Sequence, residues 1–287
     1  MNEIKYLLQS LGIFFLFLIY KLLGLKFSSI LSGAIFVVIG PLFRSNKISH
    51  KNLTKAFPAM DKTQRQKVLN NMWFNYGRMF AEYMFIKDFR FSQKESKKII
   101  VENQEEIEKI KINKKPVIFI SGHFNNFELM ALHIERSGID LAAIYRPLNN
   151  KFLNPFMEKI RKKYICKKQI KKGISGTKEI LKNFKKGTSI ALMIDQRVSE
   201  GVKCDLFNEK ASTTTIPAQF VKKFGTPIVP IYIERTKDNN FKLKIHKALE
   251  FSKHESIDTI TLKLNQVLEK MILQNPEQWI WTHNRWK

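Results

Sequence analysis

Cysteine is almost absent from this chain, which has only Cys166 and Cys204 in 287 residues. The two do not form a C-x-x-C pair or lie at a metal-ligand spacing, so we expect reduced thiols in a cytosol-facing protein. Histidines at H-x-x-x-H or H-E-x-x-H spacing are also absent. A metal-dependent hydrolase is therefore disfavoured, and we expect no bound metal.

Acidic residues are few for the number of basic ones. Lys and Arg total 50 against 25 Asp and Glu, which gives a formal net charge of +25. Part of this excess is compositional, because Lys, Ile, Asn and Phe are all abundant. The remainder predicts an acidic partner, and nucleic acid, an anionic membrane surface, a phosphorylated lipid or an acidic carrier protein would each suit.

The chain lacks internal repeats, low-complexity linkers and a small-residue cleavage site, so we expect one catalytic domain and no removed signal peptide. Two apolar runs, 7–23 and 27–43, open it. Each is at or just under the length that crosses a bilayer. We interpret the first as a transmembrane or deeply inserted anchor and the second as a monotopic or core helix. The alternative is that both are buried helices of a soluble protein.

A basic cluster follows these runs and suits the cytoplasmic side of a membrane. It consists of Arg44, Lys47, His50, Lys51 and Lys55.

The stretch 117–132, VIFISGHFNNFELMAL, carries the clearest chemistry. Its first four residues are β-branched or aromatic and predict a buried strand that ends at Ser121-Gly122. His123 follows, Asn125 or Asn126 can cap a helix, and residues 127–135 have helical apolar spacing.

His123 and Glu128 are five residues apart and would not share a face of one helix, so His123 is expected to precede the helix. From that turn, one ring nitrogen can donate to Glu128 while the other takes a proton from a substrate. This is the arrangement of general base catalysis. The alternative is a structural histidine beside an apolar strand.

Two further strands are predicted to end in polar residues. Residues 141–145 are followed by Arg146, and residues 189–194 run into Asp195-Gln196-Arg197. Carboxyl ends of strands are where open α/β sheets bind ligands. These residues are therefore candidates for the same site as His123.

Residues 152–164 predict a basic helix that carries Arg161. An arginine there supplies fork-shaped, permanently charged donors for a thioester carbonyl or a phosphate, and a solvated basic face is the alternative. Other helices are predicted from Asp61 or Thr63 to about 86, over 104–111, 173–186 and 257–273, and from a Thr-rich start at 212–215 through 218–224. Other strands are predicted over 99–101, 224–235 and 241–246. The helix that starts at Asp61 or Thr63 carries an aromatic stripe, which is expected either to pack in the core or to line an acyl-chain groove.

Several segments resemble, in order, those of one known family. HFNNFE (123–128) is similar to its H-x4-D/E block in the HFGNWE form, and HKNLTKAFPAM (50–60) to its RNL-x-x-xFP segment. YRPLNNKFLNPFMEKIRKK (145–163) is similar to its second conserved region, MIDQR (193–197) to its PDQ block, and PEQWIWTHNRWK (276–287) to its terminus. The family is the bacterial lipid A biosynthesis acyltransferases, within the glycerolipid acyltransferase superfamily. The chain departs from it at Met193-Ile194, where a proline-containing lead is usual, and at Asn208-Glu209, where a glycine is.

The resemblance implies an α/β fold, with a central mostly parallel sheet flanked by helices and an N-terminal hydrophobic anchor helix. Residues 1–44 would be the membrane-anchoring segment and 45–287 the catalytic domain. The implied reaction moves a fatty acyl chain from acyl carrier protein to a hydroxyl of a lipid A precursor, an anionic glycolipid. The protein would lie at the bacterial inner membrane with its catalytic domain facing the cytoplasm, without cofactor, metal or nucleic acid.

The site residues are predicted in two groups. The catalytic pair is His123 and Glu128. The substrate or oxyanion would be bound by Arg161, Arg146, Asp195 and Arg197, and Arg285 of the tail could also contact an anionic group. Two of the tail's tryptophans look exposed, and the alternative is that they cap the sheet by aromatic packing.

Two alternatives stay open. An acyltransferase of the same superfamily could act on another phospholipid or glycolipid with the same catalytic pair. A nonenzymatic protein that binds anionic lipid would explain the charge and leave the polar strand ends unexplained.

Overall fold

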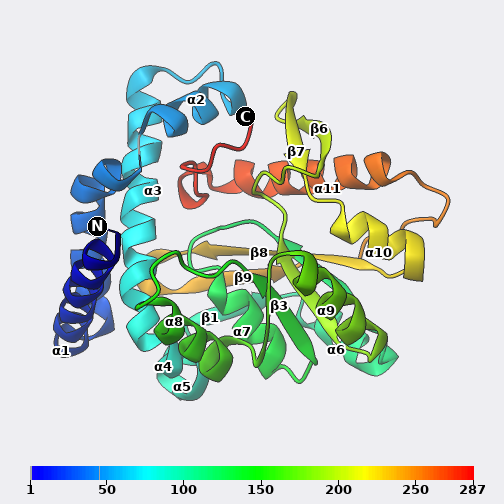
Figure 1. Cartoon of the computed structure of the whole chain (residues 1–287), viewed down its shortest axis with the longest axis horizontal. Coiled ribbons are helices and arrows are strands. Elements are labelled where there is room, and N and C mark those ends of the chain that lie inside the picture. The colour runs from blue at the N-terminus through cyan, green and yellow to red at the C-terminus, as the bar shows by residue number, and fades with distance from the viewer. Residues whose placement is uncertain (1, 45) are drawn as a thin grey trace.

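A seven-stranded sheet forms the centre of the computed structural model, which describes residues 2–44 and 46–287 (Figure 1). In spatial order its strands are β1 (Ile99–Glu102), β9 (Phe241–Ile245), β8 (Ile228–Arg235), β2 (Ile118–Ser121), β5 (Ser189–Met193), β3 (Leu141–Tyr145) and β4 (Lys168–Lys171). Neighbours pair in parallel except β8 and β9. The mostly parallel sheet expected from the sequence is confirmed.

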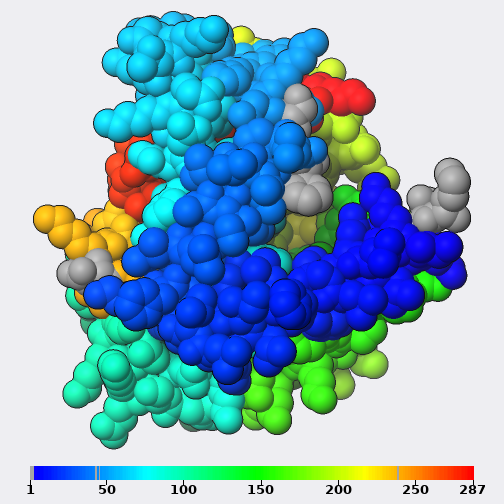
Figure 2. All heavy atoms as spheres, turned by 90° about the vertical axis from the view of Figure 1, so that its left-hand side faces the viewer, coloured from blue at the N-terminus to red at the C-terminus, as the bar shows by residue number. Residues whose placement is uncertain are grey.

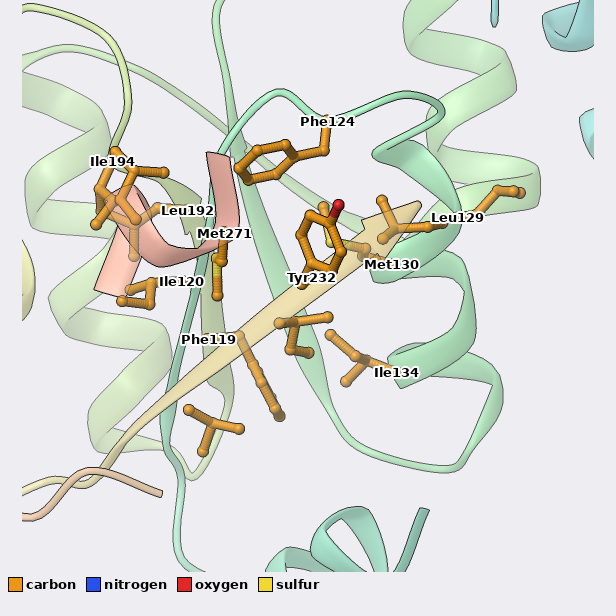
Figure 3. Packing of buried hydrophobic residues seen from close by; sticks show 14 of the residues in the cluster. Phe119, Ile120, Phe124, Leu129, Met130, Ile134, Leu192, Ile194, Tyr232 and Met271 are labelled. Carbon is orange, nitrogen blue, oxygen red and sulfur yellow. The ribbon is translucent and has the colours of Figure 1, made fainter. Parts of the chain in front are cut away.

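Helices cover the sheet, as the burial of its central strands requires. All four residues of β2 are buried. In Figure 3, Ile120 and Leu192 lie on the same side as Met271 of α11, whereas Phe119 lies toward Ile134 of α7. The helices of the domain are α6 (Gln104–Asn113), α7 (Glu128–Arg136), α8 (Asn154–Ile160), α9 (Ile174–Lys185), α10 (Ile216–Phe224) and α11 (Ile257–Gln274).

The long helix after Asp61 is shorter than predicted. Asp61 caps it in a reciprocal pair with Gln64, and α3 runs over Lys62–Glu82. A 3₁₀ turn, η1 (Tyr83–Phe85), then leads into α4 (Ile86–Phe91) and α5 (Gln93–Ser96). The helix before it, α2 (Asn46–Ala56), ends ahead of Phe57-Pro58, as the proline predicts.

The first half of the Thr-rich segment is strand, which corrects the predicted helix start at Ser212. Strands β6 (Val202–Leu206) and β7 (Glu209–Thr213) form a hairpin outside the main sheet. Phe207 and Asn208 make its two-residue turn with φ of 54° and 57°, the geometry that matches strand twist. Helix α10 begins only at Ile216, and Thr215 makes no side-chain cap.

The two apolar runs form one element, α1 (Asn2–Phe43), which is broken at Gly24. Gly24 has φ of 74°, a conformation that costs glycine little. Figure 2 shows the dark blue first part crossing one face of the molecule and the lighter blue second part turning along it. By length and composition the element could cross a membrane, and only 22% of its most apolar 18-residue stretch is buried. It fits a membrane anchor.

Both parts of α1 also contact the rest of the chain. Ser10 donates to Asn150 at 3.1 Å, and Ser32 donates to the Gly77 carbonyl at 2.6 Å. A Cβ at Gly40 would lie 2.4 Å from the Trp73 ring, so the second part packs closely on α3. Outward apolar side chains such as Leu8, Phe15, Leu22, Phe27, Val38 and Leu42 stay exposed. The proposed division of the chain at residue 44 stays a prediction.

Candidate active site

Strand register brings His123 and Asp195 together. Ser121 of β2 pairs with Met193 of β5, and each of the two residues lies two positions beyond that pair. Asp195 Oδ2 accepts the His123 backbone N–H at 2.7 Å, and Asp195 Oδ1 lies 2.8 Å from Nδ1 of the ring. The partner of the imidazole is therefore Asp195, which corrects the predicted hydrogen bond to Glu128.

Asp195 is held as an anion. It is 3% exposed, and Trp279 Nε1 donates to its Oδ2 at 2.9 Å. Burial favours the neutral carboxyl, but the His123 charge and the hydrogen bonds from His123 and Trp279 outweigh it and lower the pKa of Asp195 to about 2. At neutral pH this carboxylate can accept a hydrogen bond from a protonated Nδ1 of His123.

The pKa of His123 is shifted in the opposite direction, upward. Burial lowers the pKa of its imidazole, but the charge of Asp195 and its hydrogen bond raise it more, so the net pKa lies above the usual 6.5. Glu128 adds to the rise and Arg161 opposes it. The side chain is 19% exposed, and Nε2 makes no hydrogen bond within the described ranges. This nitrogen is open to a substrate.

Glu128 binds Arg161 instead of His123. Its Oε1 accepts Arg161 Nε at 2.9 Å and Nη2 at 2.7 Å, and it also accepts the Tyr83 hydroxyl. Arg161 begins a π-helical turn, η2 (Arg161–Ile165), and stacks over the Tyr145 ring. The two carboxylates near His123 thus have different tasks: Asp195 orients the imidazole and Glu128 holds the guanidinium.

The sequence suggested that Asn125 or Asn126 caps α7, but neither side chain does. Phe127 is the N-cap and makes no side-chain cap, and Asn125 has φ of 43°. Asn125 donates to the Gln278 side chain, while its Oδ1 accepts Arg235 Nε at 2.9 Å. These contacts fix the turn that carries His123.

A buried ion pair lies beneath this turn. Glu82 of α3 accepts Nη1 and Nη2 of Arg235 at 2.6 and 3.0 Å, and neither side chain is more than 2% exposed. Glu82 also accepts Asn126 Nδ2 at 2.9 Å and Ser29 Oγ at 3.3 Å. Sequence reasoning did not identify this pair, because its members are 153 positions apart and no spacing signal connects them.

The remaining predicted binding residues are placed differently from one another. Arg146 is exposed beyond the end of β3. Arg197 is partly buried, and its backbone N–H donates to His283 Nε2 at 3.0 Å, which places it beside the Asp195 loop. Burial lowers the pKa of His283 to about 4, so this imidazole is a neutral acceptor.

The C-terminal tail is buried, which corrects the expectation of exposed tryptophans. Trp279 and Trp281 are 1% and 0% exposed. Arg285 is fully buried and donates to the Ser212 carbonyl at 2.7 Å and to Thr213 Oγ1 at 2.6 Å. It holds β7 and is not placed to contact an anionic substrate.

The geometry fits proton transfer by a histidine that a buried carboxylate orients. Among residues 2–44 and 46–287, no group of three or more His, Cys, Asp or Glu side chains could hold a metal ion.

The whole chain, residues 1–287, matches the family described as "Bacterial lipid A biosynthesis acyltransferase". The chain belongs to this family. It is 27% identical over 253 residues to a lipid A biosynthesis lauroyltransferase of Escherichia coli K12, a match that covers 85% of this chain and 79% of the relative. It is 24% identical over 255 residues to the lipid A biosynthesis palmitoleoyltransferase of the same organism, covering 86% and 80%.

A solved structure is similar at greater distance. The 1-acyl-sn-glycerophosphate acyltransferase PlsC from Thermotoga maritima matches 90% of this chain and 100% of its own, with 16% identity and a TM-score of 0.40. That likeness is too remote to compare the two sites. Membership of the lipid A biosynthesis acyltransferase family makes the chain an acyltransferase of lipid A biosynthesis.

Proposed function

We propose that the chain transfers a fatty acyl group from acyl carrier protein to a hydroxyl of a lipid A precursor, with His123 as the general base. The observation that carries the mechanism is the His123 imidazole, whose Nδ1 is held by ionised Asp195 while Nε2 is open. The predicted His-Glu pair becomes a His-Asp pair, and Glu128 serves Arg161.

The proposed reaction is a direct displacement. Nε2 of His123 takes the proton of the acceptor hydroxyl as its oxygen attacks the thioester carbonyl carbon. The tetrahedral intermediate collapses, the C–S bond breaks, and the imidazolium returns the proton to the leaving thiolate. An ester and a free thiol result, and no cofactor is consumed.

Neither cysteine suits an acyl-enzyme route. Both Cys166 and Cys204 are buried. Burial raises the pKa of the Cys166 thiol to about 12, so the nucleophilic thiolate is scarce at neutral pH. This favours direct attack by the acceptor.

Arg161 is the proposed stabiliser of negative charge in the site. Glu128 takes its Nε and Nη2, which fixes the guanidinium plane and leaves Nη1 for the oxyanion or a phosphate. Exposed Arg146, which follows Tyr145, and half-buried Arg197 beside the Asp195 loop are proposed as further binding groups. The net charge of +25 suits an acidic carrier protein and a phosphorylated glycolipid.

We place the protein at the bacterial inner membrane, with its catalytic domain facing the cytoplasm. The exposed apolar side chains of α1 support membrane contact. The basic residues that follow support the cytoplasmic side. Two buried thiols without a disulfide agree with that compartment.

The test is an acyl transfer assay with the purified, detergent-solubilised protein. Acyl carrier protein thioesters of several chain lengths are offered with a lipid A precursor, with and without its sugar acids, and with phospholipid acceptors. We expect product on the lipid A precursor from wild type and none from His123→Ala, whereas His133→Ala, a histidine on α7 that bonds Gln104, retains activity. Transfer only to phospholipids would reassign the acceptor, and transfer by His123→Ala at the wild-type rate would remove the proposed base.

The loss of kcat/KM at low pH should follow protonation of His123. A general base must be neutral, so kcat/KM should fall as pH drops through its pKa, which Asp195 holds above 6.5. We therefore expect a midpoint above 6.5 and a shift to lower pH in Asp195→Asn, because the negative charge that favours imidazolium is gone. A wild-type midpoint at about 4, the range of carboxyl groups, would instead assign the base to a carboxylate.

A further inference from the structure

The C-terminal tail reaches the catalytic pair directly. Phe124 and Trp279 form an isolated antiparallel bridge, and the Asn125 N–H donates to the Gln278 carbonyl at 2.9 Å. The turn after His123 is thereby joined to residues more than 150 positions away.

Trp279 makes the contact that matters for the chemistry. Its Nε1 donates to Asp195 Oδ2 at 2.9 Å, and the same oxygen accepts the His123 backbone N–H at 2.7 Å. Oδ1 is left for the imidazole at 2.8 Å. Two donors on one oxygen orient the carboxylate so that the other oxygen faces Nδ1.

We propose that Trp279 is a positioning residue that acts through Asp195 to hold His123 in the tautomer with a free Nε2. This rests on the proposed role of His123 as the base. Without the indole donor, Oδ2 keeps a single hydrogen bond and the carboxylate can rotate. A proton can then reside on either ring nitrogen, and the fraction of His123 able to accept the substrate proton falls.

Trp281 provides a matched control. It is also fully buried, packs edge-on against Trp279 with ring centroids 4.6 Å apart, and donates its indole N–H at 2.7 Å. Its acceptor is the Pro276 carbonyl, which belongs to the tail itself. Trp279→Phe and Trp281→Phe therefore remove the same ring volume and one indole hydrogen bond each, but only the first of these bonds reaches Asp195.

The activity experiment compares these variants in the acyl transfer assay. We expect Trp279→Phe to lower kcat about tenfold or more with little change in KM, and Trp281→Phe to change kcat less than about threefold. In an Asp195→Asn background, Trp279→Phe should cause no further loss, since its effect passes through that carboxylate. Equal losses from the two tryptophan variants, or additive losses in the double variant, would show a merely structural role.

A second measurement does not depend on activity. The ¹⁵N signals of His123, assigned by their loss in His123→Ala, report which ring nitrogen carries the proton. We expect one tautomer, protonated at Nδ1, in wild type and Trp281→Phe, and a mixture in Trp279→Phe. An unchanged tautomer in Trp279→Phe would overturn the inference, whereas the proposed function would fail separately through absence of acyl transfer by wild type. The charges of Asp195, Glu128 and Arg161 and the neutral imidazole of His283 lie near the ring in all three proteins.

Discussion

Asp195→Asn is expected to lower kcat roughly 10⁴-fold, the scale seen when a carboxylate that orients a catalytic histidine becomes an amide. The amide cannot carry the negative charge that stabilises imidazolium, and its N–H₂ group disfavours a proton on Nδ1. Asp195 is only 3% exposed, so solvent is poorly placed to take over the contact. The measurement is kcat for acyl transfer, with circular dichroism to show that the variant is folded.

Glu128→Gln is the matched comparison, since it makes the same change in the other carboxylate near His123. We expect a clearly smaller loss of kcat, because a glutamine oxygen can still accept from Arg161 and the imidazole keeps Asp195. The reverse order, with Glu128→Gln inactive and Asp195→Asn active, would restore Glu128 as the orienting residue.

Glu82→Ala is expected to lower the free energy of unfolding by about 3–5 kcal/mol, because it leaves the Arg235 charge buried without its anionic partner. The same change removes the acceptor for Asn126 and Ser29. Urea titration in detergent, followed by fluorescence of the buried tryptophans, measures the effect through the midpoint and slope.

The exposed pair of Asp140 and Lys168 is the control for this change. Their side chains are 53% and 42% exposed, and an ion pair in water contributes about 1 kcal/mol or less. Asp140→Ala should therefore shift the urea midpoint far less than Glu82→Ala. Equal shifts would mean that the Glu82 network is not a central contributor to stability.

Most strands of the sheet could be predicted from the sequence because they are short apolar runs between turn residues. β3 appears with the predicted bounds, and β2 and β5 within one residue. β4 was missed because it reads KQIK, with a single buried apolar residue, Ile170. An edge strand of this kind owes its structure to pairing with β3, which no local pattern reveals.

The residues of the site were predicted from the sequence, but the hydrogen-bond partner of the His123 ring was not. His123 and Asp195 both follow buried strands, which the sequence shows. That β5, and not β3, lies next to β2 depends on the order of strands, and this order is a tertiary property. Spacing along the chain favoured Glu128 as the partner, yet Arg161, folded back by η2, takes that carboxylate.

The same limit applies to the tail. The sequence left the tail tryptophans either exposed or packed on the sheet, and the structure shows them buried. The hydrogen bond from Trp279 to Asp195 joins residues 84 positions apart and depends on how the tail crosses the carboxyl ends of β2 and β5. Only the folded chain shows that this packing reaches the reacting group.

The pairing of β2 with β5 has a consequence for how such enzymes can diverge. His123 and Asp195 are positioned by two adjacent strands, although they are 72 positions apart in the sequence. The segment between these strands holds Arg146, Arg161 and the exposed basic surface around them. Insertions, deletions or charge changes in this segment could change which acyl donor or acceptor binds. The His123–Asp195 pair would remain unchanged.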